Sequence, residues 1–183
     1  MRYSFWCWDS VVSPLEIKKI NKFIRENSNP SLKDQVNPAL NKKASVSIIE
    51  WPKLKKKLAG MEDVINQTNH LYFNFKTYRF NTFDAMNHNV YDSTKGGEYE
   101  YHIDVESYKL DFTTKLTCVL NLSEDPYEGG EFYIKDGPEI HIKKMSVPGA
   151  LVVFPSFLLH KVTPVTKGKR ISLVLWKKGP WWT

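Results

Sequence analysis

The hydrophobic period of this chain changes near residue 73. Before that point, two stretches repeat apolar residues at helical steps of three and four, whereas the rest alternates apolar and polar residues in short runs between turn residues. The first period is typical of amphipathic helices, and the second is typical of strands with one buried face. Helices followed by many short strands predict an antiparallel sandwich or barrel that the helices back.

Two helices are expected in the first part. The segment Ser13-Pro14-Leu15-Glu16 is a capping box with proline at the first helical position, and it predicts a helix that ends near Asn27. A polar loop and a short strand over 45–49 follow it. A second helix is expected after Pro52, with apolar residues at helical spacing from Leu54 to Leu71, although Gly60 weakens its middle by about 1 kcal/mol relative to alanine.

The alternating part of the chain predicts about nine strands. They are expected at 75–80, 86–91, 99–105, 113–122, 131–135, 139–143, 150–154, 160–164 and 170–176. Because 183 residues at 42% hydrophobic content can bury a sizeable core, we expect one domain over 1–183. It would consist of a helical support region over 1–73 and a β core over 74–178.

Cysteine usage and hydropathy indicate a cytoplasmic protein. Cys7 and Cys118 are far apart in a chain that shows no signal-peptide pattern, so two reduced thiols are preferred over a disulfide. No stretch reaches the roughly 20 apolar residues of a membrane span, so no membrane partner is expected.

A formal net charge of +6 allows phosphate-rich partners. Lysines cluster at 53–57 and again at Lys143 and Lys144, but no nucleic-acid motif accompanies them, and a solvated helix face explains the first cluster more simply. Nucleic-acid binding is therefore not favoured. The positive charge would also attract a small dianionic ligand.

His102 and Asp104 form the first half of a candidate metal site. They are two residues apart in a predicted strand, and alternation places their side chains on one face. With 5 histidines and 20 acidic residues in the chain, chance alone supplies about 0.5 such pairs, so the pair needs support from elsewhere.

That support comes from His160 and Arg170. If 160–170 is a hairpin centred near Val165, these two residues oppose one another and point to the same face. Two imidazoles and one carboxylate that leave other metal positions open are the ligand set of non-heme Fe(II) oxygenases. By alternation, Ser172, Val174 and Trp176 are expected to line the same pocket.

Arg170 indicates an acidic ligand if it faces the barrel interior. A buried arginine costs several kcal/mol unless an anion pairs with it, and a carboxylate matches the guanidinium fork. The alternative, judged from charge pattern alone, is that Arg170 is a surface residue in the basic run with Lys167 and Lys169.

Several motifs in the second half of the chain occur in the order of a known family. They are Tyr99 three residues before His102, the His102 and Asp104 pair, TCVLNLS at 117–123, YEGGEF at 127–132, PGA at 148–150, and FPSFLLHKVTPVTKGKR at 154–170. Together they resemble the iron(II)- and 2-oxoglutarate-dependent dioxygenases of the prolyl 4-hydroxylase superfamily, most closely the small PKHD-type hydroxylases. The resemblance is strong over about half of the chain.

The resemblance implies a double-stranded β-helix fold with iron held by His102, Asp104 and His160. It also implies that Arg170 binds the distal carboxylate of 2-oxoglutarate, with Tyr91 and Thr117 as candidate helpers. The implied cofactors are Fe(II), 2-oxoglutarate and O2, with ascorbate as a candidate addition. The implied reaction hydroxylates an unactivated C–H bond, in a prolyl residue of a peptide or protein or in a small molecule, and yields succinate and CO2.

Other residues and another function stay open. Glu100 shares the face of His102 and is either a contact of the site or a solvated residue at the barrel mouth. The three remaining histidines, His70, His88 and His141, are interpreted as structural. The alternative function is a non-catalytic anion- or sugar-binding β-sandwich.

Overall fold

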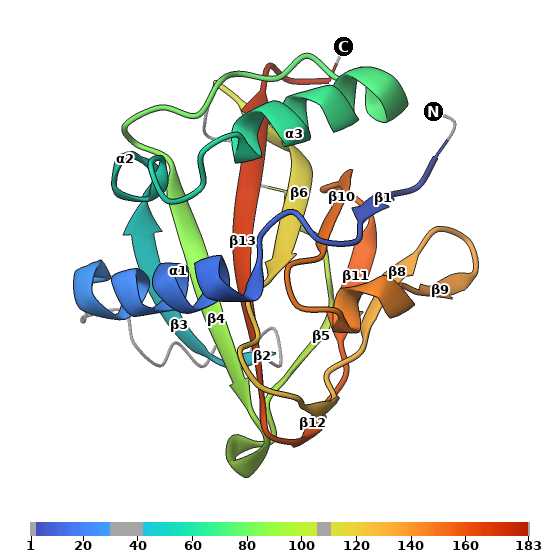
Figure 1. Cartoon of the computed structure of the whole chain (residues 1–183). Coiled ribbons are helices and arrows are strands. Elements are labelled where there is room, and N and C mark those ends of the chain that lie inside the picture. Colours follow the sequence, from blue (N-terminus) through green and yellow to red (C-terminus); the bar gives the residue numbers. More distant parts are fainter. Residues whose placement is uncertain (1–2, 30–41, 106–110, 183) are drawn as a thin grey trace.

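The computed structural model describes residues 3–29, 42–105 and 111–182, which form two antiparallel sheets backed by helices (Figure 1). The six-stranded sheet has the order β1 (Trp6–Trp8), β10 (Leu151–Pro155), β6 (Thr113–Asn121), β13 (Lys169–Gly179), β4 (Ala85–Asp92) and β3 (Ser45–Glu50). The five-stranded sheet has the order β2 (Lys42–Lys43), β5 (Glu98–His102), β11 (Leu159–Val162), β8 (Phe132–Lys135) and β9 (Glu139–His141). The short strands β7 (Glu128–Gly129) and β12 (Val165–Lys167) pair separately. The predicted fold class, a double-stranded β-helix backed by helices, is confirmed.

The first predicted helix forms as α1 (Pro14–Asn27). The Glu16 backbone N–H donates to the Ser13 hydroxyl oxygen at 3.3 Å, and the Glu16 carboxylate accepts from the Ser13 backbone N–H at 2.7 Å, which completes the capping box. The helix crosses β3, β4 and β13 in Figure 1 and buries Ile17, Ile20 and Ile24.

The second predicted helix is interrupted. It consists of α2 (Trp51–Leu54), a turn region, and α3 (Met61–Thr68), which a π-helical turn extends over Asn69–Phe73. Gly60 lies directly before α3 with φ at +80°, in the left-handed region that glycine adopts most easily. The apolar spacing correctly identified Leu54, Leu58, Met61 and Ile65 as buried, but Leu71 is 55% exposed and a continuous helix was wrong.

The predicted strand at 75–80 is also wrong, since this segment contains no strand. Its backbone bonds to other partners: the Phe75 N–H donates to the Asn69 side chain at 3.0 Å, and the Tyr78 N–H donates to the Lys178 carbonyl at 2.7 Å. The next strand along the chain, β4, has no free edge for this segment, because it pairs with β3 on one side and β13 on the other. The alternation at 75–80 thus reflects side-chain packing of Phe75 and Phe80 against the core.

The predicted pairing of His160 with Arg170 is wrong as well. The chain leaves the five-stranded sheet after β11 and enters the six-stranded sheet at β13, so His160 pairs with His102 while Arg170 pairs with Tyr91. The intervening β12 pairs with β7 instead of forming a simple hairpin. His160 and Arg170 therefore face the barrel interior from different sheets.

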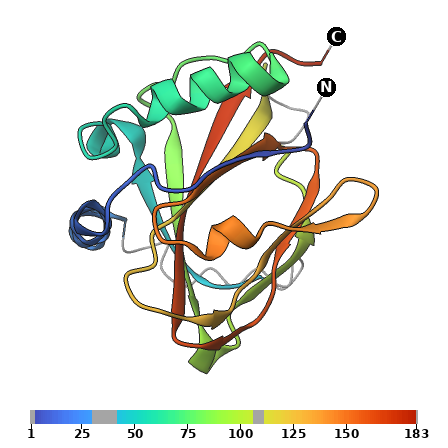
Figure 2. The same ribbon diagram turned by 45° about the vertical axis from the view of Figure 1, so that its right-hand side comes forward.

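Two apolar cores lie on the two faces of the six-stranded sheet. One joins the helices to its outer face, and the other fills part of the space between the sheets, which curve toward each other in Figure 2. Every residue of β6 is consequently buried. Cys7 and Cys118 are both free thiols, as predicted.

Candidate metal centre

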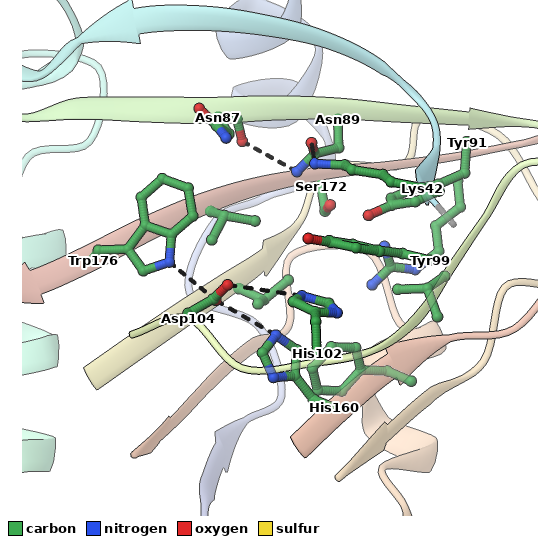
Figure 3. Close-up of a pocket in the computed structure, with 15 residues that line it drawn as sticks. Lys42, Asn87, Asn89, Tyr91, Tyr99, His102, Asp104, His160, Ser172 and Trp176 are labelled. Carbon is green, nitrogen blue, oxygen red and sulfur yellow. Dashed lines mark hydrogen bonds and ion pairs between the residues drawn. The ribbon is translucent and has the colours of Figure 1, made fainter. Parts of the chain in front are cut away.

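His102, Asp104 and His160 lie together at one side of the barrel interior (Figure 3). His102 ends β5 and lies opposite His160 of β11. Asp104 lies beyond the end of β5, where its backbone N–H donates to the Ser156 carbonyl at 2.9 Å. Register and this backbone bond thus bring three side chains from two distant segments to one place.

The two imidazoles present the same nitrogen to the shared space. His102 Nδ1 bonds to the Glu100 carbonyl at 2.8 Å, and His160 Nδ1 bonds to the Leu158 carbonyl at 3.0 Å. Because carbonyl oxygens only accept, each Nδ1 carries the proton and each Nε2 keeps a lone pair for a metal.

The donor atoms have the separation that a common metal ion needs. The distances are 3.7 Å from His102 Nε2 to Asp104 Oδ1 and 3.4 Å from His160 Nε2 to Asp104 Oδ2. One ligand atom from each of the three residues lies within 4.8 Å of the others. Ligands about 2.1 Å from one metal are about 3 to 4 Å apart, so the three residues fit a metal ion without a change of fold.

Asp104 is oriented by two further side chains. The Thr117 hydroxyl donates to Asp104 Oδ2 at 2.9 Å, and the Trp176 indole N–H donates to the same oxygen at 3.0 Å. Burial raises the pKa of Asp104, but contacts that include the hydrogen bond from the Trp176 indole outweigh burial and hold the pKa well below its usual range. The carboxylate is therefore ionised and fixed for a metal.

Arg170 is a buried cation that has no hydrogen-bond partner in the part of the chain that the structure describes. Its side chain is 1% exposed, and none of its guanidinium nitrogens has a hydrogen-bond partner among the described residues. The Tyr91 ring lies beside it, with 5.5 Å from the ring centroid to Cζ. An unpaired buried guanidinium is costly, so this geometry favours an anionic ligand.

Arg170 and the three candidate ligands line one cavity between the two sheets. It is lined by Lys42, Asn87, Asn89, Tyr91, Tyr99, His102, Asp104, Val119, Phe132, His160, Val162, Arg170, Ser172, Val174 and Trp176. Both sheets contribute. The expected lining by alternate residues of β13, from Arg170 to Trp176, is confirmed.

The two candidate helper residues have different positions. Tyr91 lines the cavity, and burial raises the pKa of its hydroxyl to about 12, so it stays a neutral donor. Thr117 is not among the lining residues and contacts Asp104 instead. The Glu100 side chain is exposed, and only its backbone contacts the site, through His102.

Three polar lining residues were missed from the sequence. Asn87 and Asn89 alternate with Tyr91 on β4, so the strand period could have identified them. Lys42 stands in a polar stretch interpreted as a loop, and nothing in the sequence distinguishes it from the neighbouring lysine. Its place is set by the pairing of β2 with β5.

The other histidines and the lysine clusters lie outside this cavity. His70 is exposed, His88 bonds to Asn21, and His141 stacks on Tyr133. Lys53 and Lys144 form surface ion pairs with acidic neighbours. No helix within the described ranges has the length and apolar content that a bilayer crossing needs.

Comparisons with known proteins agree with this geometry. Residues 86–178 match the family model of the 2OG-Fe(II) oxygenase superfamily. A PKHD-type hydroxylase of Janthinobacterium sp. (strain Marseille) is 37% identical over 94 residues, which are 48% of this chain and 41% of the relative. One of Stenotrophomonas maltophilia is 40% identical over 86 residues, which are 44% of this chain and 38% of the relative. The chain thus spans about two fifths of the length of these relatives.

Solved structures with low sequence identity share the fold. A Pseudomonas putida prolyl-4-hydroxylase superposes with a TM-score of 0.69 at 21% identity, covering 98% of this chain and 94% of that one. The viral collagen prolyl hydroxylase of Paramecium Bursaria Chlorella virus-1 gives 0.60 at 20% identity, covering 97% of each chain. Because the family model matches half of this chain, at residues 86–178, the chain belongs to the 2OG-Fe(II) oxygenase superfamily.

Proposed function

We propose that this protein is an Fe(II)- and 2-oxoglutarate-dependent dioxygenase that hydroxylates an unactivated C–H bond. The observation that carries the proposal is the buried, unpartnered Arg170 in the same cavity as His102, Asp104 and His160. A carboxylate-binding cation beside a metal-binding triad is what a chelating keto acid requires. The described residues would act as one catalytic domain.

The ligand set suits ferrous iron. Two neutral imidazoles and one carboxylate leave three coordination positions for other molecules. When bound, Fe(II) with 2-oxoglutarate and O2 supplies an oxidation that converts the keto acid to succinate and CO2 and hydroxylates the substrate. The protein holds the metal, orients both reactants and excludes water.

Arg170 would bind the distal carboxylate of 2-oxoglutarate. Its guanidinium fork can donate two parallel hydrogen bonds, and the adjacent Tyr91 hydroxyl is a neutral donor within the same cavity. Thr117 would act on the site through Asp104, and a direct contact of Thr117 with the co-substrate stays a prediction.

The proposed substrate is a prolyl residue in a peptide or protein. The likeness to solved prolyl hydroxylases supports this substrate. Exposed apolar side chains would provide a surface for a peptide: Ile103 and Val105 flank Asp104 in the chain, and Phe157 packs against Trp182. Ascorbate is proposed as an accessory reductant, which would increase the number of turnovers per enzyme molecule.

An absorption measurement tests the proposal. Under anaerobic conditions, Fe(II) and 2-oxoglutarate should give a weak metal-to-ligand band that is lost in His160→Ala and Asp104→Ala. His141→Ala is the matched control, because His141 lies outside the cavity, and it should keep the band. No band in the intact protein, with iron bound, would refute the proposal.

Arg170 also supports a second candidate, a non-catalytic anion-binding module. The two candidates differ in what the triad does. In a simple binding module, Asp104→Ala leaves the affinity for 2-oxoglutarate unchanged, whereas in the oxygenase it lowers that affinity, because the chelated metal is lost.

A further inference from the structure

Lys42 is a second cation in the cavity, and the proposed chemistry gives it no role. It lies on β2 opposite Tyr99 of β5 and is partly buried. Its ammonium group donates to Asn89 Oδ1 at 3.0 Å and lies 4.8 Å from the centroid of the Tyr99 ring. Both partners are neutral, and within the described ranges no carboxylate forms an ion pair with Lys42.

The position of Lys42 differs from that of Arg170. His102 stacks on one face of Tyr99, with the ring centroids 3.5 Å apart, so the ammonium group covers the other face (Figure 3). Arg170 pairs with Tyr91, whereas Asn89, the partner of Lys42, lies two residues along β4. Two residues of a strand span about 7 Å, so the partners of the two cations lie at different positions along β4.

A charge count shows why a second cation matters. A ferrous ion, a dianionic co-substrate, the Asp104 carboxylate and the Arg170 guanidinium group together have no net charge. Lys42 adds one positive charge that this set does not balance. Burial lowers the pKa of Lys42 to about 8, and Asp104 opposes that effect, so the ammonium form still predominates at neutral pH.

We propose that Lys42 binds a carboxylate group of the substrate, so that the site prefers a prolyl compound with a negative charge near the carbon to be oxidised. The inference rests on the proposed function and specifies its substrate class. The polar side chains of Asn87, Asn89 and Ser172 line the same cavity and offer further hydrogen bonds. The carboxylate could belong to a free or C-terminal proline, or to an acidic residue beside an internal proline.

A matched pair of substrates tests the charge directly. N-acetylproline and N-acetylprolinamide have nearly the same size and differ in one negative charge. The intact enzyme should use the acid with a kcat/KM about 10-fold or more above that of the amide, as a charge-assisted hydrogen bond predicts. Blocked peptides with Glu or Gln after an internal proline decide between the two sources of the carboxylate.

Variants of Lys42 connect the preference to this side chain. Lys42→Met should bring the acid-to-amide ratio close to one, mainly through a higher KM for the acid, and Lys42→Arg should keep part of the preference. Lys43→Met is the control, because Lys43 is next on the same strand but pairs with Glu98 and does not line the cavity. It should behave like the intact enzyme.

Binding without turnover gives an independent result. Calorimetry on the protein loaded with Zn(II) and 2-oxoglutarate should show N-acetylproline binding that is lost in Lys42→Met. Equal affinity within both substrate pairs, N-acetylproline with its amide and the Glu peptide with the Gln peptide, would overturn the inference. A Lys42→Met variant that raises the KM for 2-oxoglutarate instead would also overturn it. Failure of the proposed function looks different, because the metal-to-ligand band is then absent with the intact protein.

Discussion

Arg170 combines complete burial with an unpaired guanidinium group, so its replacement should affect ligand binding more than folding. We expect Arg170→Met to raise the KM for 2-oxoglutarate by about 100-fold, since a charge-assisted pair is lost. The free energy of unfolding without ligand should stay the same or rise, because an uncompensated buried charge is removed.

The KM for 2-oxoglutarate is measured from the rate of succinate formation, and the free energy of unfolding is measured by urea denaturation. Lys169→Met is the control, since the exposed Lys169 precedes Arg170 and pairs with Asp92 on the surface. An unchanged KM in Arg170→Met would contradict the assignment.

Trp176 offers a second test at a single atom. Trp176→Phe keeps an aromatic ring, although a smaller one, and removes the indole N–H that donates to Asp104 Oδ2. Loss of such a supporting contact should weaken metal affinity by about 10-fold or more, which a Co(II) titration measures. Trp8→Phe loses the indole hydrogen bond to Thr68, far from the triad, and should bind metal normally. Equal affinities in the two variants would mean that Trp176 does not position the carboxylate.

For the individual residues of the site, the sequence predicted which residues take part better than it predicted their contacts. Strand alternation brought His102 and Asp104 to one face, but the backbone bond to Ser156 holds Asp104 where β5 has already ended. The contact of Thr117 with Asp104 depends on how two separate segments are arranged in space, and Lys42 enters the cavity only through the pairing of β2 with β5. A single sequence does not contain that information.

Gly149 illustrates how one backbone position fixes neighbouring elements. Its φ is +85°, and an added Cβ would lie 2.3 Å from the Val12 carbonyl oxygen, before α1. Gly137 has φ at +72°, but an added Cβ there meets nothing within 4 Å. We expect Gly149→Ala to lower the free energy of unfolding by about 3 kcal/mol or more and Gly137→Ala by about 1 kcal/mol. Equal effects in urea denaturation would show that backbone strain alone matters.

His88 couples the docking of α1 on the sheet to pH. Its Nε2–H donates to Asn21 Oδ1 of α1 at 3.0 Å, and burial lowers the pKa of the imidazole to about 4. In the unfolded chain the imidazole binds a proton near pH 6.5, whereas in the folded protein it does so only near pH 4. The stability that neutral His88 contributes is therefore complete above pH 6.5 and is lost as pH falls toward 4. Between pH 7.5 and 5, His88 should cost about 2 kcal/mol of stability.

Variants with glutamine isolate this contribution. His88→Gln keeps a donor for Asn21 but does not titrate, so its stability should fall by about 2 kcal/mol less than that of the intact protein over the same interval. His70→Gln, at an exposed position, should keep the pH dependence of the intact protein. If the unfolding free energy changed equally with pH in both variants, His88 would be excluded as the cause of the pH dependence.

Elements with strong local signals were predicted well. The capping box gave the start of α1, and most strands lie within a few residues of their expected positions. The errors arose where tertiary structure decides: Gly60 divides the second helix, 75–80 packs without pairing, and the segment after His160 changes sheets. Hydrophobic spacing reports burial, and it does not report which strand is the partner.

The molecule uses the two faces of one sheet for different purposes. The helices cover the outer face of the six-stranded sheet, so the inner face and the second sheet can enclose a cavity with a buried cation. Without a ligand, the buried guanidinium group of Arg170 lowers the stability of the folded protein. Ligands that pair with Arg170 and join the triad should therefore stabilise the whole fold.

The increase in stability follows from linkage. At 100 times its dissociation constant, a ligand that binds only the folded state adds about 2.7 kcal/mol, which corresponds to a melting-temperature increase of about 5 to 10 °C for a chain of this size. Anaerobic Fe(II) with 2-oxoglutarate should produce such an increase in the intact protein, followed by scanning calorimetry. Asp104→Ala should lose most of it, because the metal no longer joins the keto acid to the triad, whereas His141→Ala should keep it. An identical increase in Asp104→Ala would mean that the co-substrate binds without the metal, and the cavity would then be an anion site rather than a catalytic one.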